Sequence, residues 1–149
     1  LLYNLKIMVG LPWEQHMTFL NSKKQEKEII ERIKKDVINL GRHEAIFCYT
    51  IGNEIPAPIV RWYGEKKITK FLHRLYKTVK KADPDGLVTY VNYPTTEYLD
   101  LPFLDFDSFN VYLEEKEKLD KYLELLHNLT GDKPPVTYTH ITLTKISRG

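Results

Sequence analysis

The chain has 149 residues, a length typical of one domain, and 42% of them are hydrophobic and 28% charged, as in ordinary globular proteins. Its 22 Lys and Arg residues nearly balance 20 Asp and Glu residues, so a formal charge of +2 argues against nucleic-acid and membrane partners. Cys48 is the only cysteine, which excludes an internal disulfide and a zinc site built on paired cysteines, and no run approaches the roughly 20 apolar residues of a membrane span.

The chain opens with an apolar strand at residues 5–11, which Pro12 ends. Its start lacks the basic region and cleavage site of a signal peptide, which predicts a cytoplasmic location. Because the chain begins without Met and enters the strand almost at once, we interpret it as a piece of a longer protein. The cluster Trp13-Glu-Gln-His16 follows, and Trp13 either lines a pocket or covers the core.

Two amphipathic helices surround the central part of the sequence. Ser22 and Gln25 form a capping box ahead of the first helix, and Gly41 is placed to stop it. The second helix ends before the turn signal Asp83-Pro-Asp-Gly86. Their apolar faces carry Ile29, Ile30, Ile33, Val37 and Ile38 in the first helix and Ile68, Phe71, Leu72, Leu75, Tyr76 and Val79 in the second.

Between these helices lies a short apolar run, residues 45–51, that is rich in β-branched and aromatic residues and favours a buried parallel strand. It stops at Gly52 and is followed directly by Asn53 and Glu54. Ligands of parallel α/β folds collect at the carboxyl ends of strands, so this position fits a ligand site. We expect a loop at residues 56–64, whose Arg61, Trp62 and Tyr63 either contact a ligand or pack the loop onto the body.

The second half repeats the alternation of strands and helices. A third strand at residues 87–92 ends in Asn92, and a fourth at residues 107–113 carries Tyr112 near its end. We expect a loop with one helical turn around residues 97–101 between them. A helix with Leu119, Tyr122, Leu123, Leu126 and Leu129 on one face precedes Gly131, and residues 136–143 predict a half-exposed fifth strand.

Strands that alternate with helices predict parallel βα units and an α/β fold. The sequence has no G-x-G-x-x-G and no G-x-x-x-x-G-K-S/T motif, and its five histidines show no metal-ligand spacing, so we expect neither a cofactor nor a metal. Polar and aromatic residues instead stand at the carboxyl ends of successive strands. This pattern favours a (β/α) barrel over an open doubly wound sheet, with an active site assembled from several strand ends.

The residues at these strand ends resemble a known family. The stretch His43-Glu-Ala-Ile-Phe-Cys-Tyr-Thr-Ile-Gly-Asn-Glu-Ile-Pro56 is similar to the strand-four Asn-Glu motif of retaining (β/α)₈ glycoside hydrolases, and nearest to the barrel domain of glycoside hydrolase family 2-like proteins such as β-galactosidases, β-glucuronidases and β-mannosidases. Gly52-Asn-Glu-Ile-Pro56, Thr89-Tyr-Val-Asn-Tyr-Pro94 and Phe109-Asn-Val-Tyr112 resemble a bacterial group in which this domain accompanies a family 2 glycosyltransferase. The resemblance runs from Leu5 to about Pro134.

The resemblance implies a role for each residue of these motifs. Glu54 corresponds to the general acid/base, Asn53 to the ligand of the sugar 2-hydroxyl, and Tyr112 to the strand-six tyrosine that hydrogen-bonds the nucleophile. A partly desolvated Glu beside another carboxylate can hold a proton near neutral pH, and an amide can strengthen its bond to the 2-hydroxyl in an oxocarbenium-like transition state. Further candidates for substrate contacts are Trp13, Trp62, Asn92 and Asn110.

Two departures from the family pattern limit this interpretation. Retaining enzymes need a second carboxylate about 5 Å from the first, and the family would place it at or near Thr139. Residues 135–149 contain no Asp or Glu, so this segment is divergent, truncated or frame-shifted. Second, the five predicted strands correspond to strands three to seven of an eight-stranded barrel, so the chain is a single incomplete barrel domain.

We therefore expect part of a retaining glycosidase barrel that acts on β-linked sugars, with the acid/base half of its site and no evident nucleophile. The isolated chain should show negligible turnover unless Glu114 or Glu14 replaces the nucleophile. The alternative is a non-catalytic carbohydrate-binding or regulatory module that uses Trp13, Trp62 and Tyr112 as stacking surfaces beside Asn53 and Asn92. In a third interpretation Glu54 only caps the following loop. Expected partners are a carbohydrate and, at open sheet edges, the missing barrel segments, a fused glycosyltransferase domain or a second copy.

Overall fold

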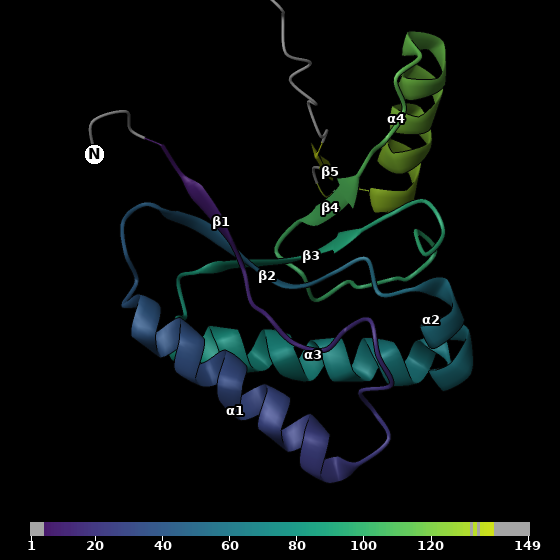
Figure 1. The fold of residues 1–149 in the computed structure, drawn as a ribbon. Coiled ribbons are helices and arrows are strands. Elements are labelled where there is room, and N and C mark those ends of the chain that lie inside the picture. The colour runs from purple at the N-terminus through teal and green to yellow at the C-terminus, as the bar shows by residue number, and fades with distance from the viewer. Residues whose placement is uncertain (1–4, 132, 134, 139–149) are drawn as a thin grey trace, which may run out of the picture.

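A computed structural model describes residues 5–131, 133 and 135–138, and its strands and helices alternate along the chain (Figure 1). All expected strands and the three long helices are present. In chain order the elements are β1 (Ile7–Gly10), α1 (Lys23–Leu40), β2 (Ile46–Asn53), α2 (Ala57–Tyr63), α3 (Glu65–Ala82), β3 (Leu87–Asn92), β4 (Asp107–Asn110), α4 (Lys116–Thr130) and β5 (Pro135–Tyr138).

The strands form one five-stranded sheet in the order β1-β2-β3-β4-β5, and every neighbouring pair is parallel. Each strand therefore lies beside the next one in the sequence, without the reversal of strand order that defines a doubly wound sheet. Sequential order with helical connections is the arrangement of a (β/α) barrel. The sheet is an open part of such a barrel, with β1 and β5 as its edges, as the sequence predicts.

Helix α1 begins and ends where its sequence signals predict. The Ser22 side chain accepts a hydrogen bond from the Gln25 backbone N–H at 3.1 Å, which satisfies one of the first free donors of the helix. At the other end Gly41 adopts a left-handed conformation with φ of 60°, which glycine takes without the steric cost of a Cβ atom.

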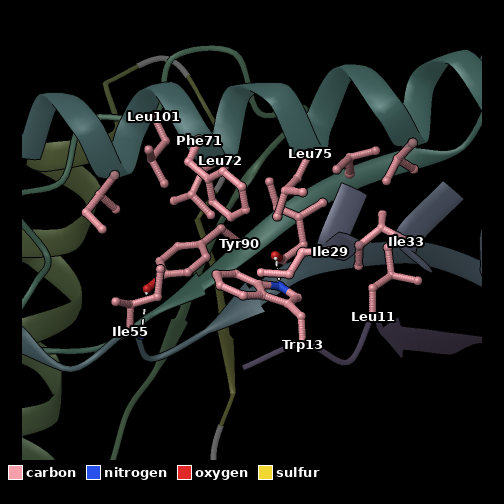
Figure 2. Close-up of a cluster of buried hydrophobic side chains, with 14 of the residues drawn as sticks. Leu11, Trp13, Ile29, Ile33, Ile55, Phe71, Leu72, Leu75, Tyr90 and Leu101 are labelled. Carbon is pink, nitrogen blue, oxygen red and sulfur yellow. Dashed lines mark hydrogen bonds between the residues drawn. The ribbon is translucent and has the colours of Figure 1, made fainter. Parts of the chain in front are cut away.

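The main core lies between one face of β1–β3 and the helices α1 and α3, which run side by side across that face (Figure 1). Alternate strand residues, Val9, Tyr49, Ile51 and Tyr90, belong to this helix-facing side of the sheet. Figure 2 shows Phe71, Leu72 and Leu75 of α3 above the sheet, opposite Trp13 and Tyr90. Burial of this apolar surface is the main stabilising term for the fold.

A smaller cluster holds α4 against β4. Leu126 of α4 is fully buried against Phe109 and Val111, and the Tyr122 hydroxyl donates a 2.6 Å hydrogen bond to Glu97 in the loop before β4. Because this cluster is small, most of the apolar core lies under β1–β3 and not under β4.

Several boundaries differ from those that the sequence predicts. Residues 57–63 form α2 and not a loop, and residues 94–98 form turns without the helical turn expected near residue 97. The strands β1 and β4 are shorter than expected, so Tyr112 lies two residues beyond β4. Most of the divergent segment 135–149 lies outside the described residues, apart from β5. Within the described residues, no helix has the length and apolar character needed to cross a lipid bilayer.

Candidate active site

The candidate site lies at the carboxyl ends of β2 and β4, which β3 separates. Asn53 is the last residue of β2 and Glu54 follows it, while Asn110 ends β4 and Tyr112 lies just beyond. Parallel strands deliver these four residues to the same edge of the sheet, although more than fifty residues separate the two pairs in the sequence.

Two side chains donate hydrogen bonds to the same oxygen of Glu54. The Tyr112 hydroxyl lies 2.5 Å from Oε1 and the Asn110 Nδ2 lies 2.6 Å from it. Asn110 Nδ2 also donates to Asn53 Oδ1 at 3.0 Å, so Asn110 joins both residues of the Asn-Glu pair. Within the described residues Glu54 Oε2 has no hydrogen-bond partner, whereas Oε1 has two.

The hydrogen bond to Glu54 also changes the pKa of the Tyr112 hydroxyl. Its hydrogen bond to the Glu54 carboxylate raises the pKa of Tyr112, with smaller contributions from burial and from the negative charge of Glu54. The resemblance implies that Tyr112 hydrogen-bonds the nucleophile. In the structure the Tyr112 hydroxyl donates to Glu54. The expected position of the nucleophile lies outside the described residues, so the contact with a nucleophile stays a prediction.

A break in the sheet register sets the direction of Asn53. The pairing of β2 with β3 is regular from Cys48 to Thr50 and then shifts, so that Asn53 lies opposite Val91. Strict alternation would place Asn53 on the same face as Tyr49 and Ile51, toward the helices. The irregularity turns Asn53 to the other face, as a β-bulge does next to many active sites.

On that other face the sheet borders a hollow of about 760 Å³. Its wall includes Thr50, Asn53, Val91 and Asn110, which come from three adjacent strands. The hollow is therefore the interior side of the partial barrel, and its polar residues lie toward the carboxyl ends of β2 and β4. The remaining lining residues are Lys6, Ile7, Met8, Gly10 and Phe47.

Glu54 itself has a backbone conformation that most residues avoid. Its φ of 51° lies in the left-handed region, which costs a non-glycine residue about 1–3 kcal/mol. The backbone N–H of Glu54 donates to the Val91 carbonyl at 2.9 Å, and the residues on both sides of Glu54 are also hydrogen-bonded. Each such bond contributes about 0.5–1.5 kcal/mol, so together they can offset the strain. Glu54 does not cap α2, whose N-cap is Pro56 without a side-chain cap hydrogen bond.

Three of the expected substrate contacts lie elsewhere. Trp13 is only 8% exposed, donates from Nε1 to the Ile51 carbonyl at 2.8 Å, and packs edge-on against Phe19, so it covers the core. Asn92 is buried and its amide shapes the following loop, where it contacts the backbone and hydroxyl of Thr96. Trp62 lies on α2 and is 77% exposed, and no described interaction joins it to Glu54.

Within the described residues, no hydrogen bond joins Glu54 to the second carboxylate that a retaining site needs. Thr139, where the family pattern expects it, lies outside the described residues. Glu14 is held in a two-pronged ion pair by Arg32, at 2.5 and 3.0 Å, which lowers the pKa of Glu14 and directs it to α1. Glu114 is exposed in the segment after β4. No group of three His, Cys, Asp or Glu residues in the described part of the chain is arranged to hold a metal ion.

Two residues that contact the Asn-Glu turn were not singled out from the sequence. Gln15 accepts a hydrogen bond from the Asn53 N–H at 2.6 Å, and the Tyr90 hydroxyl accepts one from the Ile55 N–H at 2.9 Å. Gln15 lies in the polar cluster that follows β1, so its place after a strand was a usable signal. Tyr90 gave no signal, because it is an ordinary aromatic residue within a buried strand.

The family model described as "Glycosyl hydrolases family 2, TIM barrel domain" matches residues 4–145. No curated protein matches the sequence. Among solved structures, an FMN-binding β-glucuronidase from Facaelibacterium prausnitzii L2-6 aligns with a TM-score of 0.70 and 21% identity, over 89% of this chain and 21% of that one.

Two further structures have the same fold. A β-glucuronidase from Bacteroides uniformis aligns with a TM-score of 0.68 and 17% identity, over 86% of this chain and 17% of its own. A cold-adapted β-galactosidase from Rahnella sp. R3 gives a TM-score of 0.60 and 12% identity, over 79% and 28% of the two chains. The chain thus spans between a sixth and a third of the length of these proteins.

Proposed function

Because the chain belongs to the glycosyl hydrolase family 2 TIM barrel domain family, we propose that its strand-end cluster is the acid/base half of a retaining site that acts on β-linked sugars. The arrangement around Glu54 carries the proposal. Tyr112 and Asn110 hold Oε1, while Oε2 has no partner within the described residues. Asn53, fixed by Asn110, lines the hollow on the interior face of the sheet.

In the proposed reaction Glu54 Oε2 gives its proton to the glycosidic oxygen as the bond from that oxygen to the sugar C1 breaks. The electron pair of this bond stays with the departing oxygen. Asn53 donates from its amide nitrogen to the sugar 2-hydroxyl, a contact that strengthens as positive charge develops at C1. Tyr112 and Asn110 keep Oε1 in place, so that only Oε2 faces the substrate.

A retaining reaction also needs a nucleophile on the opposite face of C1. With no Asp or Glu in residues 135–149, we expect the isolated chain to have negligible turnover of aryl β-glycosides. Azide added to the solution can supply the missing nucleophile. It bonds to C1 as the aryl oxygen leaves with its electron pair, and the products are an α-glycosyl azide and a phenol.

The test compares aryl β-glycosides with good and poor leaving groups in the presence of azide. A poor leaving group needs the proton from Glu54, so Glu54→Gln should slow azide-dependent turnover by about 10²–10⁴-fold. A dinitrophenyl glycoside has a leaving group that needs no proton, so Glu54→Gln should slow its azide-dependent turnover only slightly. The control is Glu44→Gln. Glu44 is an exposed residue just before the other end of β2, so this variant should leave the turnover of both substrates unchanged.

The outcome that would overturn the acid/base role is azide-dependent turnover with the same leaving-group dependence in Glu54→Gln and in the unaltered chain. Turnover without azide that disappears in Glu54→Gln would instead support the role and refute the expected inactivity. Glu114→Gln and Glu14→Gln would then identify which carboxylate serves as nucleophile.

The alternative of a non-catalytic carbohydrate-binding module has less support. It relies on Trp13 and Asn92, both of which are buried, and leaves Tyr112 and Trp62 as the exposed aromatic residues of that proposal. A carbohydrate ligand fits both functions. The cytoplasmic location, the companion glycosyltransferase domain and self-association through the sheet edges stay predictions from the sequence.

A further inference from the structure

The backbone around Glu54 is held by three acceptors from two different parts of the chain. The N–H groups of residues 53–55 donate in turn to the Gln15 side chain at 2.6 Å, the Val91 carbonyl at 2.9 Å and the Tyr90 hydroxyl at 2.9 Å. Gln15 belongs to the segment after β1, whereas Val91 and Tyr90 belong to β3. The left-handed turn at Glu54 is thus fixed from the segment after β1 on one side and from β3 on the other.

Gly52 allows these acceptors to approach. A Cβ atom at this position would lie 3.1 Å from Gln15 Oε1 and 3.1 Å from two ring atoms of Tyr90. Both distances are shorter than ordinary van der Waals contact. Glycine is therefore needed at this position for close packing, because the Gln15 amide and the Tyr90 ring occupy the space that a side chain would need.

Water cannot replace the Tyr90 hydroxyl at this place. Tyr90 is 1% exposed and Ile55 is fully buried, so the Ile55 N–H depends on a protein acceptor (Figure 2). Burial raises the pKa of Tyr90, which keeps its hydroxyl neutral. A buried tyrosine that accepts from the backbone next to the candidate acid has a role that hydrophobic packing alone does not explain.

We propose that Gln15 and Tyr90 are positioning residues that hold Glu54 in its left-handed conformation and so aim its carboxyl group at Tyr112 and at the substrate. The catalytic role of Glu54 rests on the proposed function. The orientation of the Glu54 side chain does not depend on that function. Neither residue touches the substrate in this proposal. Both act through the backbone of residues 53–55.

Tyr112 reports whether Glu54 stays in place, because its pKa is raised mainly by the hydrogen bond to that carboxyl group. The experiment titrates Tyr112 by NMR of the tyrosine ring carbons, with the signal assigned from Tyr112→Phe. Tyr90→Phe keeps the ring and removes the acceptor. We expect the Tyr112 pKa in this variant to fall more than half of the way to its value in Glu54→Gln.

The matched control is Tyr49→Phe. Tyr49 is also fully buried in the sheet, and its hydroxyl donates to Asp83 at 3.0 Å, away from the site. Its removal should lower stability without moving the Tyr112 pKa. This separates positioning of Glu54 from a general loss of stability.

Gln15→Met, which keeps bulk and loses the acceptor, provides an independent variant at a partly exposed position. We expect it to lower the Tyr112 pKa in the same direction, and it decides the matter if Tyr90→Phe does not fold. An unchanged Tyr112 pKa in the folded variants would overturn the proposal. Since the titration involves no turnover, it can succeed where the azide experiment fails, and the reverse also holds.

Discussion

The Tyr112 hydroxyl donates a 2.5 Å hydrogen bond to Oε1 of Glu54 across the intervening strand β3. This bond and the one from Asn110 both end on the same oxygen, so they fix the carboxyl group while Oε2 has no hydrogen-bond partner within the described residues. A fixed carboxyl group is a requirement for proton transfer to a substrate in one defined position. Because this hydrogen bond raises the pKa of Tyr112, a change in that pKa would show whether the Glu54 carboxyl group has moved.

Glu54→Gln should lower the pKa of Tyr112. An ionised Tyr112 would repel the Glu54 carboxylate and would also lose the proton that it donates, which is why the pKa is raised in the native site. Glutamine removes the charge and weakens the hydrogen bond, so the titration should move toward lower pH. NMR titration of the tyrosine ring carbons measures the shift.

Glu114→Gln is the control for that experiment. Glu114 lies two residues after Tyr112 and carries the same charge, but no described hydrogen bond joins the two side chains. If its removal moved the Tyr112 pKa as far as Glu54→Gln does, general charge near the phenol would explain the effect and the specific contact would not.

Much of the fold follows from local patterns. The apolar spacing in α1 and α3, the Ser22 and Gly41 caps and the apolar runs of β2 and β3 all act over a few residues, so the sequence displays them directly. Helix α2 was missed because Pro56 and Pro58 suggest a loop, whereas proline is well tolerated at the first turn of a helix.

The candidate site was predictable where it depends on strand ends and not where it depends on register. Asn53, Glu54 and Tyr112 follow apolar runs, and the structure brings them together with Asn110. Trp13 and Asn92 also lie near strand ends, but their side chains turn toward the core or the loop. Which face such a residue takes depends on long-range pairing that a single sequence does not display.

Leu72→Ala should lower the free energy of unfolding by about 2–5 kcal/mol. Leu72 is fully buried between α3 and the sheet, so the shorter side chain leaves a cavity in the main core. Lys77→Ala, on the exposed side of the same helix, should change it by less than about 0.5 kcal/mol. Denaturant titration followed by circular dichroism measures both. Equal effects at the two positions would show that α3 does not pack as described.

Gly86→Ala should destabilise the chain by about 1–3 kcal/mol, although the sequence marks Gly86 only as part of a turn. A Cβ atom there would lie 2.8 Å from Asp83 Oδ2 and 2.8 Å from the Tyr49 ring, which are themselves hydrogen-bonded. Gly10→Ala is the matched control, because a Cβ atom at Gly10 meets nothing within 4 Å. Thermal unfolding of the two variants should differ, and a neutral Gly86→Ala would contradict the tight packing at this turn.

Asp107→Asn should stabilise the chain at neutral pH and lose this advantage in acid. Burial at the start of β4, aided by the nearby charge of Asp100, raises the pKa of Asp107, and Lys133 opposes this in part. A pKa raised by folding means that the protonated form suits the folded state. The contribution of protonated Asp107 to the free energy of unfolding is complete below the unfolded pKa near 3.8, and it is lost as the pH rises through the folded pKa. Asparagine is neutral throughout, so denaturant titrations at neutral pH and below pH 4 should show a gain only at neutral pH. Asp85→Asn removes the same charge from an exposed turn and should show no such pH-dependent gain. A gain of equal size for Asp107→Asn at both pH values would mean that packing, and not the buried charge, is responsible.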